Sequence, residues 1–223
     1  MDNLDSKIEI SYRYLSEILK KQGLEKLYVS WTGGKDSTVV LHLFLEFLKE
    51  KKIKFTPKVL FIDTGFTFPE IREFMGNFSK IYNFNLTIIK PDVDLKQYPK
   101  EDVILCCRDL KIKPLKKAIS DLDIKVVLTG VRRDENESRR NVSWLEHKKE
   151  PQYLQVNPIV HWKESDVWAY HIKNNLPYCS LYDMGYRSID CIPCTNKATK
   201  GERSGRNPKK EQELEKLHSL GYF

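Results

Sequence analysis

Residues 30–37 read Ser30-Trp31-Thr32-Gly33-Gly34-Lys35-Asp36-Ser37 and join a short apolar run to a longer segment with helical periodicity. Two adjacent glycines at such a junction let backbone N–H groups converge on an anion, and the helix N-terminus adds positive potential. Thr32 and Ser37 supply hydroxyl groups, and Lys35 supplies a positive charge. The stretch therefore predicts a phosphate-binding loop at the carboxyl end of a strand, where open α/β sheets bind ligands.

The rest of the chain alternates strand and helix patterns. Apolar runs predict strands at 27–31, 59–62, 86–89, 126–130 and about 153–156. Helices are predicted up to about residue 22, at 37–49, from Pro69 onward, at 108–120, at 164–173 and at about 209–218. The charged segment 132–149 is predicted to be a loop. Strands that alternate with helices form parallel βαβ units, so the sequence predicts an α/β fold with a doubly wound parallel sheet.

Two parts are expected within the chain. Residues 1–175 contain the alternating strands and helices, and we expect them to form a nucleotide-binding α/β domain. Residues 176–223 are turn-rich at first and contain a Cys-x-x-Cys motif, so we expect them to form a cysteine-rich C-terminal extension that ends in the tail helix.

Composition limits the classes of partner. The 223 residues carry a formal net charge of +7, which favours polyanionic partners without choosing between a nucleotide and a nucleic acid. No run approaches the roughly 18 apolar residues that a membrane span needs, and the N-terminus lacks a secretory pattern. We expect a cytoplasmic homo- or hetero-oligomer without a membrane partner, in which a nucleic acid or a sulfur carrier is a possible further partner.

Four of the five cysteines form two pairs, Cys106-Cys107 and Cys191 with Cys194. An odd cysteine count in a chain without a secretory signal argues against a disulfide framework. Four thiolates brought together by the fold suit an iron–sulfur cluster or zinc, and adjacent cysteines are awkward ligands for tetrahedral zinc. The pairs therefore predict a [4Fe–4S] cluster, with zinc as the alternative, and Cys179 is interpreted as a plain core or surface thiol.

The phosphate loop differs from a Walker P-loop, which would have four residues between its first glycine and Gly-Lys-Ser/Thr. It resembles the Ser-Gly-Gly-Lys-Asp-Ser loop of PP-loop ATP pyrophosphatases, with Thr32 in place of the first serine. That resemblance implies an adenine-nucleotide enzyme that cleaves ATP between its α and β phosphates. Asp36 and Asp63 would then position Mg²⁺ on the phosphates, and cationic side chains would stabilise the charge that develops there: Lys35, Arg132, Arg133 and Arg139.

Across most of its length the chain resembles the phosphoadenylyl/adenylyl-sulfate reductase family. The resemblance rests on residues 61–70, on Cys106-Cys107-Arg108, on the arginine loop 129–139, and on residues 157–170 and 185–195. It implies a [4Fe–4S] cluster on Cys106, Cys107, Cys191 and Cys194, close to the sulfate or phosphate of the substrate. Together the resemblances imply a set of nucleotide-binding residues: Ser30, Thr32, Gly33, Gly34, Lys35, Asp36, Ser37, Asp63, Thr64, Gly130, Arg203 and Arg206.

Two departures from the reductase pattern affect the predicted reaction. Those reductases attack adenylyl sulfate with a cysteine near the C-terminus, where this sequence reads Lys209-Lys210-Glu211-Gln212. They usually carry a degraded phosphate loop, whereas this loop is whole. The segment from Glu202 to Arg206 is instead similar to the small subunit of heterodimeric ATP sulfurylase.

Three functions follow from these patterns. The leading hypothesis is a cluster-containing PP-loop enzyme of sulfur metabolism that binds ATP–Mg²⁺, cleaves it at the α–β bond and adenylates or thiolates an acceptor. The alternative is a sulfonucleotide reductase that produces sulfite with a nucleophile from a partner or from Cys179. The second alternative is a non-catalytic nucleotide-binding subunit.

Overall fold

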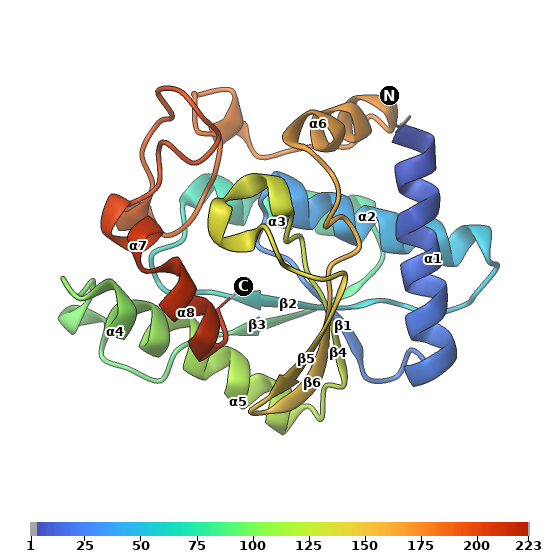
Figure 1. The fold of residues 1–223 in the computed structure, drawn as a ribbon, viewed down its shortest axis with the longest axis horizontal. Helices are drawn as coiled ribbons and strands as arrows, with labels where there is room; N and C mark the ends of the chain where they lie inside the picture. Colours follow the sequence, from blue (N-terminus) through green and yellow to red (C-terminus); the bar gives the residue numbers. More distant parts are fainter. Residues whose placement is uncertain (1–3, 223) are drawn as a thin grey trace.

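The computed structural model describes residues 4–222, which form a six-stranded sheet with helices on both faces (Figure 1). The sheet order is β3-β2-β1-β4-β6-β5. The strands are β1 (Leu27–Ser30), β2 (Lys58–Ile62), β3 (Asn85–Ile89), β4 (Val126–Leu128), β5 (Leu145–Lys149) and β6 (Gln152–Val156). Neighbouring strands pair in parallel except β5, which runs antiparallel to β6. The predicted α/β doubly wound sheet is confirmed.

Successive side chains of the buried strands pack against helices on opposite faces of the sheet. Val29 in β1 packs into the core under α1 (Leu4–Gln22), α2 (Lys35–Glu50), α3 (Pro69–Ile81) and α6 (Glu164–Lys173). Its neighbour Tyr28 points to the opposite face, where it packs with Leu115 and Ile119 of α5 (Lys113–Asp121). Successive strand residues face opposite sides of a sheet, so a central strand needs apolar residues throughout.

The segment predicted as a loop at 132–149 contains a strand, and that part of the prediction was wrong. Strand β5 (Leu145–Lys149) pairs with β6 through a short hairpin and forms the edge of the sheet. Its sequence is rich in charge because an edge strand is solvated on its outer side, and charged side chains there protect against pairing with other chains. Because strands were predicted from apolar runs, the charged residues of β5 kept it from being predicted.

The helical segment around the cysteine pair is longer than predicted. Helix α4 (Val103–Cys107) is capped by Asp102, whose carboxylate accepts hydrogen bonds from the backbone N–H groups of Ile104 and Leu105. A π-helical turn (Arg108–Ile112) then continues directly into α5. The cysteine pair lies within this segment rather than ahead of it, and π-helical turns are frequent at functional sites.

The C-terminal residues fold back over this segment (Figure 1). The predicted tail helix is divided into α7 (Pro208–Gln212) and α8 (Leu214–Leu220). Leu214 and Leu217 of α8 pack with Cys107 and Ile112 in a small separate core. The division at residue 175 stays a prediction. Within residues 4–222, no helix combines the length and apolar character needed to cross a membrane.

Candidate functional site

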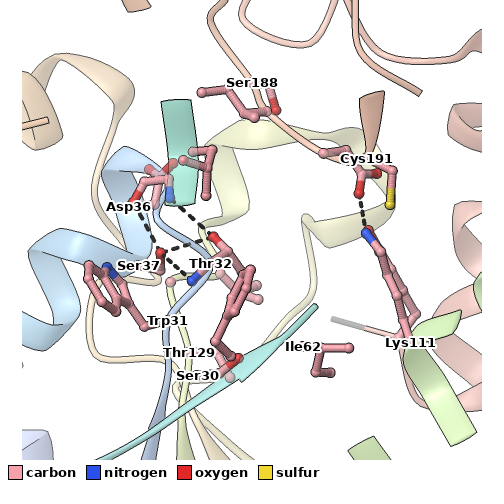
Figure 2. Close-up of a pocket in the computed structure, with 18 of the residues that line it drawn as sticks. Ser30, Trp31, Thr32, Asp36, Ser37, Ile62, Lys111, Thr129, Ser188 and Cys191 are labelled. Carbon is pink, nitrogen blue, oxygen red and sulfur yellow. Dashed lines mark hydrogen bonds and ion pairs between the residues drawn. The ribbon is translucent and has the colours of Figure 1, made fainter. Parts of the chain in front are cut away.

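A pocket of about 210 Å³ lies at the carboxyl ends of β1, β2 and β4. Figure 2 shows the phosphate loop, with Thr32, Asp36 and Ser37, on one side of this pocket, and Lys111 with Cys191 on the other. The lining brings together residues from four parts of the chain: the loop (Ser30, Thr32, Gly34, Lys35, Asp36, Ser37), the ends of β2 and β4 (Thr64, Gly130), the arginine loop (Glu135, Arg139) and the extension (Cys191, Arg203, Arg206, Tyr222). The predicted loop thus shares a cavity with three of the predicted arginines, Arg139, Arg203 and Arg206.

The phosphate loop holds its shape through its own side chains. Gly33 has a φ of +73°, which a side chain rarely adopts, and a Cβ there would lie 2.9 Å from Cγ2 of Ile71. The Ser37 hydroxyl accepts a hydrogen bond from the Thr32 N–H at 3.1 Å and donates to the Gly34 carbonyl at 3.0 Å. The Lys35 N–H donates to the Tyr182 hydroxyl oxygen at 2.7 Å, so the extension reaches the loop directly.

The Lys35 ammonium is buried and surrounded by acceptors. It contacts Oδ2 of Asp36 at 3.1 Å, Oε1 of Glu202 at 2.6 Å and the carbonyl oxygen of Arg187 at 3.0 Å. Burial alone would lower the pKa of Lys35, but Asp36, Tyr182 and Glu202 outweigh it and hold that pKa above its ordinary value. Lys35 is therefore a permanent cation at the start of α2.

Arg132 completes this ionic cluster from the loop after β4. Its Nε lies 2.6 Å from Oδ1 of Asp36, its Nη2 lies 2.6 Å from Oε1 of Glu202, and its side chain is fully buried. Burial alone would raise the pKa of Asp36, but Lys35 and Arg132 lower it to about 2. Asp36 therefore stays ionised and ties the phosphate loop to the arginine loop.

Glu135 organises the other arginines. It forms ion pairs with Arg139 and, at 3.3 Å, with Arg203 of the extension. Burial acts to raise the pKa of Glu135, but Arg139 and the other cations hold it below its ordinary value. Carboxylate oxygens of Asp36, Glu135 and Glu202 lie within 4.8 Å of one another, which is the ligand chemistry that Mg²⁺ prefers.

Four of the predicted catalytic and nucleotide-binding residues do not line the pocket: Gly33, Asp63, Arg132 and Arg133. Arg133 donates from Nε to the Val142 carbonyl at 2.7 Å on the exposed side of the arginine loop. Asp63 accepts hydrogen bonds from the Gly65 N–H and the Thr67 hydroxyl, both at 3.1 Å, and from Arg72 at 2.9 Å. It shapes the turn after β2, and its predicted contact with Mg²⁺ stays a prediction.

Cys191 lines the far side of the pocket, and the other paired cysteines do not line it. All five cysteines are free thiols, and Cys107 is buried while Cys106, Cys191 and Cys194 are partly buried. Sγ of Cys191 lies 3.2 Å from the Thr64 hydroxyl oxygen. Burial raises the pKa of Cys106, and the nearby thiols of Cys107 and Cys191 raise it further. The two sequence pairs are therefore neighbours in space.

Three cations beside the cysteines share one buried carboxylate. Asp190 forms ion pairs with Lys111, with Lys210 and, at 2.9 Å, with Arg206. Burial acts to raise the pKa of Asp190, but the three cations hold it well below its ordinary value. Sequence reasoning missed this cluster, although Asp190 directly precedes Cys191 and Lys111 follows Cys107 by one helical turn.

Cys179 lies in the main core and is fully buried. It does not line the pocket, and it packs in the same core as Leu176 and Leu181. This confirms its interpretation as a core thiol.

Sequence comparisons with known proteins agree on one family. The sequence model of the phosphoadenosine phosphosulfate reductase domain matches residues 26–197. Adenosine 5'-phosphosulfate reductase of Lysinibacillus sphaericus is 32% identical over 219 residues, covering 92% of this chain and 90% of that protein. Adenosine 5'-phosphosulfate reductase 1 of Bacillus subtilis is 35% identical over 166 residues, covering 70% of each.

Solved structures with low sequence identity share the fold. Phosphoadenylyl-sulfate reductase from Candida auris, in a phosphate complex, has a TM-score of 0.68 at 24% identity and covers 83% of this chain and 90% of its own. FMN adenylyltransferase of Candida glabrata has a TM-score of 0.70 at 20% identity, with 97% and 80% covered. The U34-tRNA thiolase NcsA from Methanococcus maripaludis, solved with its [4Fe-4S] cluster, has a TM-score of 0.57 at 14% identity, with 99% and 80% covered.

Proposed function

The chain belongs to the phosphoadenosine phosphosulfate reductase domain family of enzymes, and from that premise we propose that it is a sulfonucleotide reductase acting on adenosine 5'-phosphosulfate. The observation that carries the proposal is one pocket lined by the phosphate loop, by three arginines and by Cys191. Such a pocket offers a nucleotide-binding loop at one end and cationic donors for a sulfate at the other. The relatives with the names above support this reading over the cleavage of ATP.

Unused donors in the pocket favour an anionic ligand. Nε of Arg139 and Nε of Arg206 are buried and make no hydrogen bond to any described residue, although Nε of Arg206 lies 3.8 Å from Oε1 of Glu211, and both arginines line the pocket. A buried donor without a partner costs about 1–3 kcal/mol. A phosphate or sulfate oxygen would satisfy such donors, so the arginine end of the pocket is suited to the phosphosulfate group.

The four paired cysteines fit a [4Fe–4S] cluster better than zinc. Tetrahedral zinc with Zn–S bonds of about 2.3 Å would bring its sulfur ligands to about 3.8 Å apart. No three of the described cysteine sulfurs lie within 4.8 Å of one another. A [4Fe–4S] cluster holds its thiolates farther apart than zinc does, and the three cations on Asp190 suit its negative charge. Cys106, Cys107, Cys191 and Cys194 would hold the cluster, which would supply a local electrostatic field beside the substrate.

The reaction needs a thiolate from outside the described chain. A thiolate attacks the sulfur of the phosphosulfate, an S–S bond forms, the S–O bond to phosphate breaks, and AMP leaves with the electron pair. A second thiol then attacks the sulfur of the first thiol, which releases sulfite and leaves a disulfide. Cys179 is fully buried away from the pocket, and the other four cysteines are the proposed cluster ligands. We therefore propose that an external dithiol supplies both thiols, while Arg139 and Arg206 stabilise the departing charge.

Cleavage of ATP is retained as a second candidate because the structure holds a specific feature for it. Asp36, Glu135 and Glu202 group their oxygens at the phosphate loop, where Mg²⁺ on a polyphosphate would need them. The two candidates make different products. Anaerobically purified protein is incubated with adenosine 5'-phosphosulfate and dithiothreitol, and separately with ATP and Mg²⁺. Sulfite and AMP from the first mixture support the reductase, whereas pyrophosphate from the second with no sulfite from the first refutes it.

A matched pair of arginine variants tests the pocket itself. Arg139→Gln removes a buried pocket arginine, whereas Arg140→Gln removes its neighbour, whose side chain is 76% exposed and pairs with Glu137. A charge-assisted hydrogen bond contributes about 1.5–3 kcal/mol. We expect Arg139→Gln to lower kcat/KM about 10- to 100-fold and Arg140→Gln to leave it unchanged. Equal effects of the two substitutions would contradict the assignment.

The cluster has a test that does not depend on activity. Iron, acid-labile sulfide and visible absorbance are measured for the wild type, for Cys191→Ser and for the control Cys179→Ser. We expect Cys191→Ser to lose iron and absorbance and Cys179→Ser to retain them. An iron-free wild type after anaerobic reconstitution, or an unchanged spectrum in Cys191→Ser, would refute the assignment.

A further inference from the structure

Lys35, the cation of the phosphate loop, is already occupied by groups of the protein itself. An ammonium has three N–H donors, and the Lys35 ammonium has three acceptors: Asp36, Glu202 and the Arg187 carbonyl. The Lys35 backbone N–H, which points outward at the start of α2, is bonded to the Tyr182 hydroxyl. A phosphate can therefore reach Lys35 only if one of these acceptors leaves.

Glu202 is the acceptor that can leave with the least disruption. Asp36 lies in the first turn of α2, and the Arg187 carbonyl belongs to the backbone. Glu202 lies instead on a turn in the extension, and residues 199–201 just before it are exposed. Burial raises the pKa of Glu202 even though Lys35 lowers it, so the ionised carboxylate is not strongly stabilised in this position.

Glu202 offers two cations the same kind of contact that a phosphate would offer, and one of them, Lys35, lines the pocket. Its Oε1 lies 2.6 Å from Nζ of Lys35 and 2.6 Å from Nη2 of Arg132, a lysine and an arginine that are both almost completely buried. A carboxylate between an ammonium and a guanidinium has the charge and the hydrogen-bond geometry of a bound phosphate oxygen. The carboxylate therefore satisfies two buried cations that would otherwise attract a nucleotide.

We infer that Glu202 is a specificity-determining residue that acts as an internal anion, competing with ligand phosphates for Lys35 and Arg132 and so selecting against nucleotides with a polyphosphate chain. This inference rests on the proposed function in one respect, since it gives a reason why an intact phosphate loop accompanies a phosphosulfate substrate. A phosphosulfate group at Arg139 and Arg206 leaves Glu202 in place. A pyrophosphate group on Lys35 must displace it. This role is the opposite of the one that Glu202 would have as a Mg²⁺ ligand in the second candidate function, so the pyrophosphate titrations are done without Mg²⁺.

The test compares two matched glutamate variants. Glu202→Gln removes the charge and keeps the side-chain volume, and Glu137→Gln does the same at a glutamate that is 84% exposed and pairs with Arg140. Binding of inorganic pyrophosphate and of AMP is measured by isothermal titration calorimetry. We expect Glu202→Gln to bind pyrophosphate at least tenfold more tightly than the wild type, with a change of less than about threefold for AMP and no change in Glu137→Gln. Unchanged or weaker pyrophosphate binding by a folded Glu202→Gln protein would overturn the inference.

A measurement on the wild type covers the case in which Glu202→Gln fails to fold. Hydrogen–deuterium exchange is followed with and without saturating pyrophosphate. We expect residues 199–204 to exchange faster when pyrophosphate is bound and residues 32–38 to exchange more slowly. Faster exchange in neither segment, or equal protection of both, would overturn the inference. Neither measurement involves sulfite, so the test of Glu202 can be interpreted even if the reductase assay fails.

Discussion

Of the glycines that line the pocket, Gly130 should tolerate an added methyl group least. It follows β4 and lies against the start of α2, where a Cβ would be 2.8 Å from the Ser37 nitrogen and 2.9 Å from the Asp36 carbonyl carbon. Both neighbours are backbone atoms, so no side-chain rotation can relieve the contact. The substitution Gly130→Ala must therefore separate the loop after β4 from the phosphate loop.

The size of the effect follows from packing. Adding a methyl group to a close-packed site costs about 1–3 kcal/mol. For a chain of this length each 1 kcal/mol shifts the Tm by about 2–4 °C, so we expect a fall of about 2–12 °C. The same displacement would move Asp36, Ser37 and Gly130, which all line the pocket, so AMP should bind at least tenfold more weakly.

Gly76→Ala is the matched control. Gly76 lies inside α3, and a Cβ there would meet nothing within 4 Å. Alanine is favoured over glycine in a helix by about 0.5–1 kcal/mol, so this variant should raise the Tm by about 1–4 °C and leave AMP binding unchanged. Circular dichroism melts and calorimetric titrations give both quantities. A Gly130→Ala protein with the Tm and AMP affinity of the wild type would refute the packing argument.

Two further variants address charge. Asp190→Asn leaves two buried cations, Arg206 and Lys210, and the partly exposed Lys111 without their carboxylate, so it should lower the free energy of unfolding by about 3–5 kcal/mol. Arg140→Gln at the surface should change it by less than about 1 kcal/mol. Urea denaturation measures both free energies, and equal losses would contradict the burial argument. Burial, with help from Arg139, lowers the pKa of His218 to about 4, so between pH 6.5 and 4 the unfolded chain binds a proton that the folded protein excludes. The contribution of His218 to the free energy of unfolding is complete above about pH 6.5 and is lost as the pH falls towards 4. The urea midpoint should therefore fall less from pH 7 to pH 5 in His218→Gln than in the wild type. Parallel pH profiles of the two proteins would exclude His218 as the cause of the loss of stability.

Patterns among neighbouring residues were enough to predict the fold and the family. The apolar runs predicted β1, β2, β3, β4 and β6, and the paired glycines placed the phosphate loop at the end of β1 as observed. These predictions succeeded because strand periodicity and turn chemistry are properties of neighbouring residues. The resemblance to the reductase family was confirmed for the same reason, since its motifs are short and keep their order along the chain. Strand β5 was missed because its charge reflects its position at the edge of the sheet, which depends on the whole fold.

The sequence by itself therefore determined the α/β fold, the family and the position of the Gly33-Gly34 loop between β1 and α2. Only the tertiary structure decided which charges meet in the pocket. Glu202 pairs with Lys35, which lies 167 residues away in the sequence, and Asp190 pairs with Lys111, which lies 79 residues away. The carboxylate of Asp63 accepts a hydrogen bond from Arg72. Contacts of this kind follow from how distant elements pack, and a buried ion is stable only where that packing brings its partners within reach.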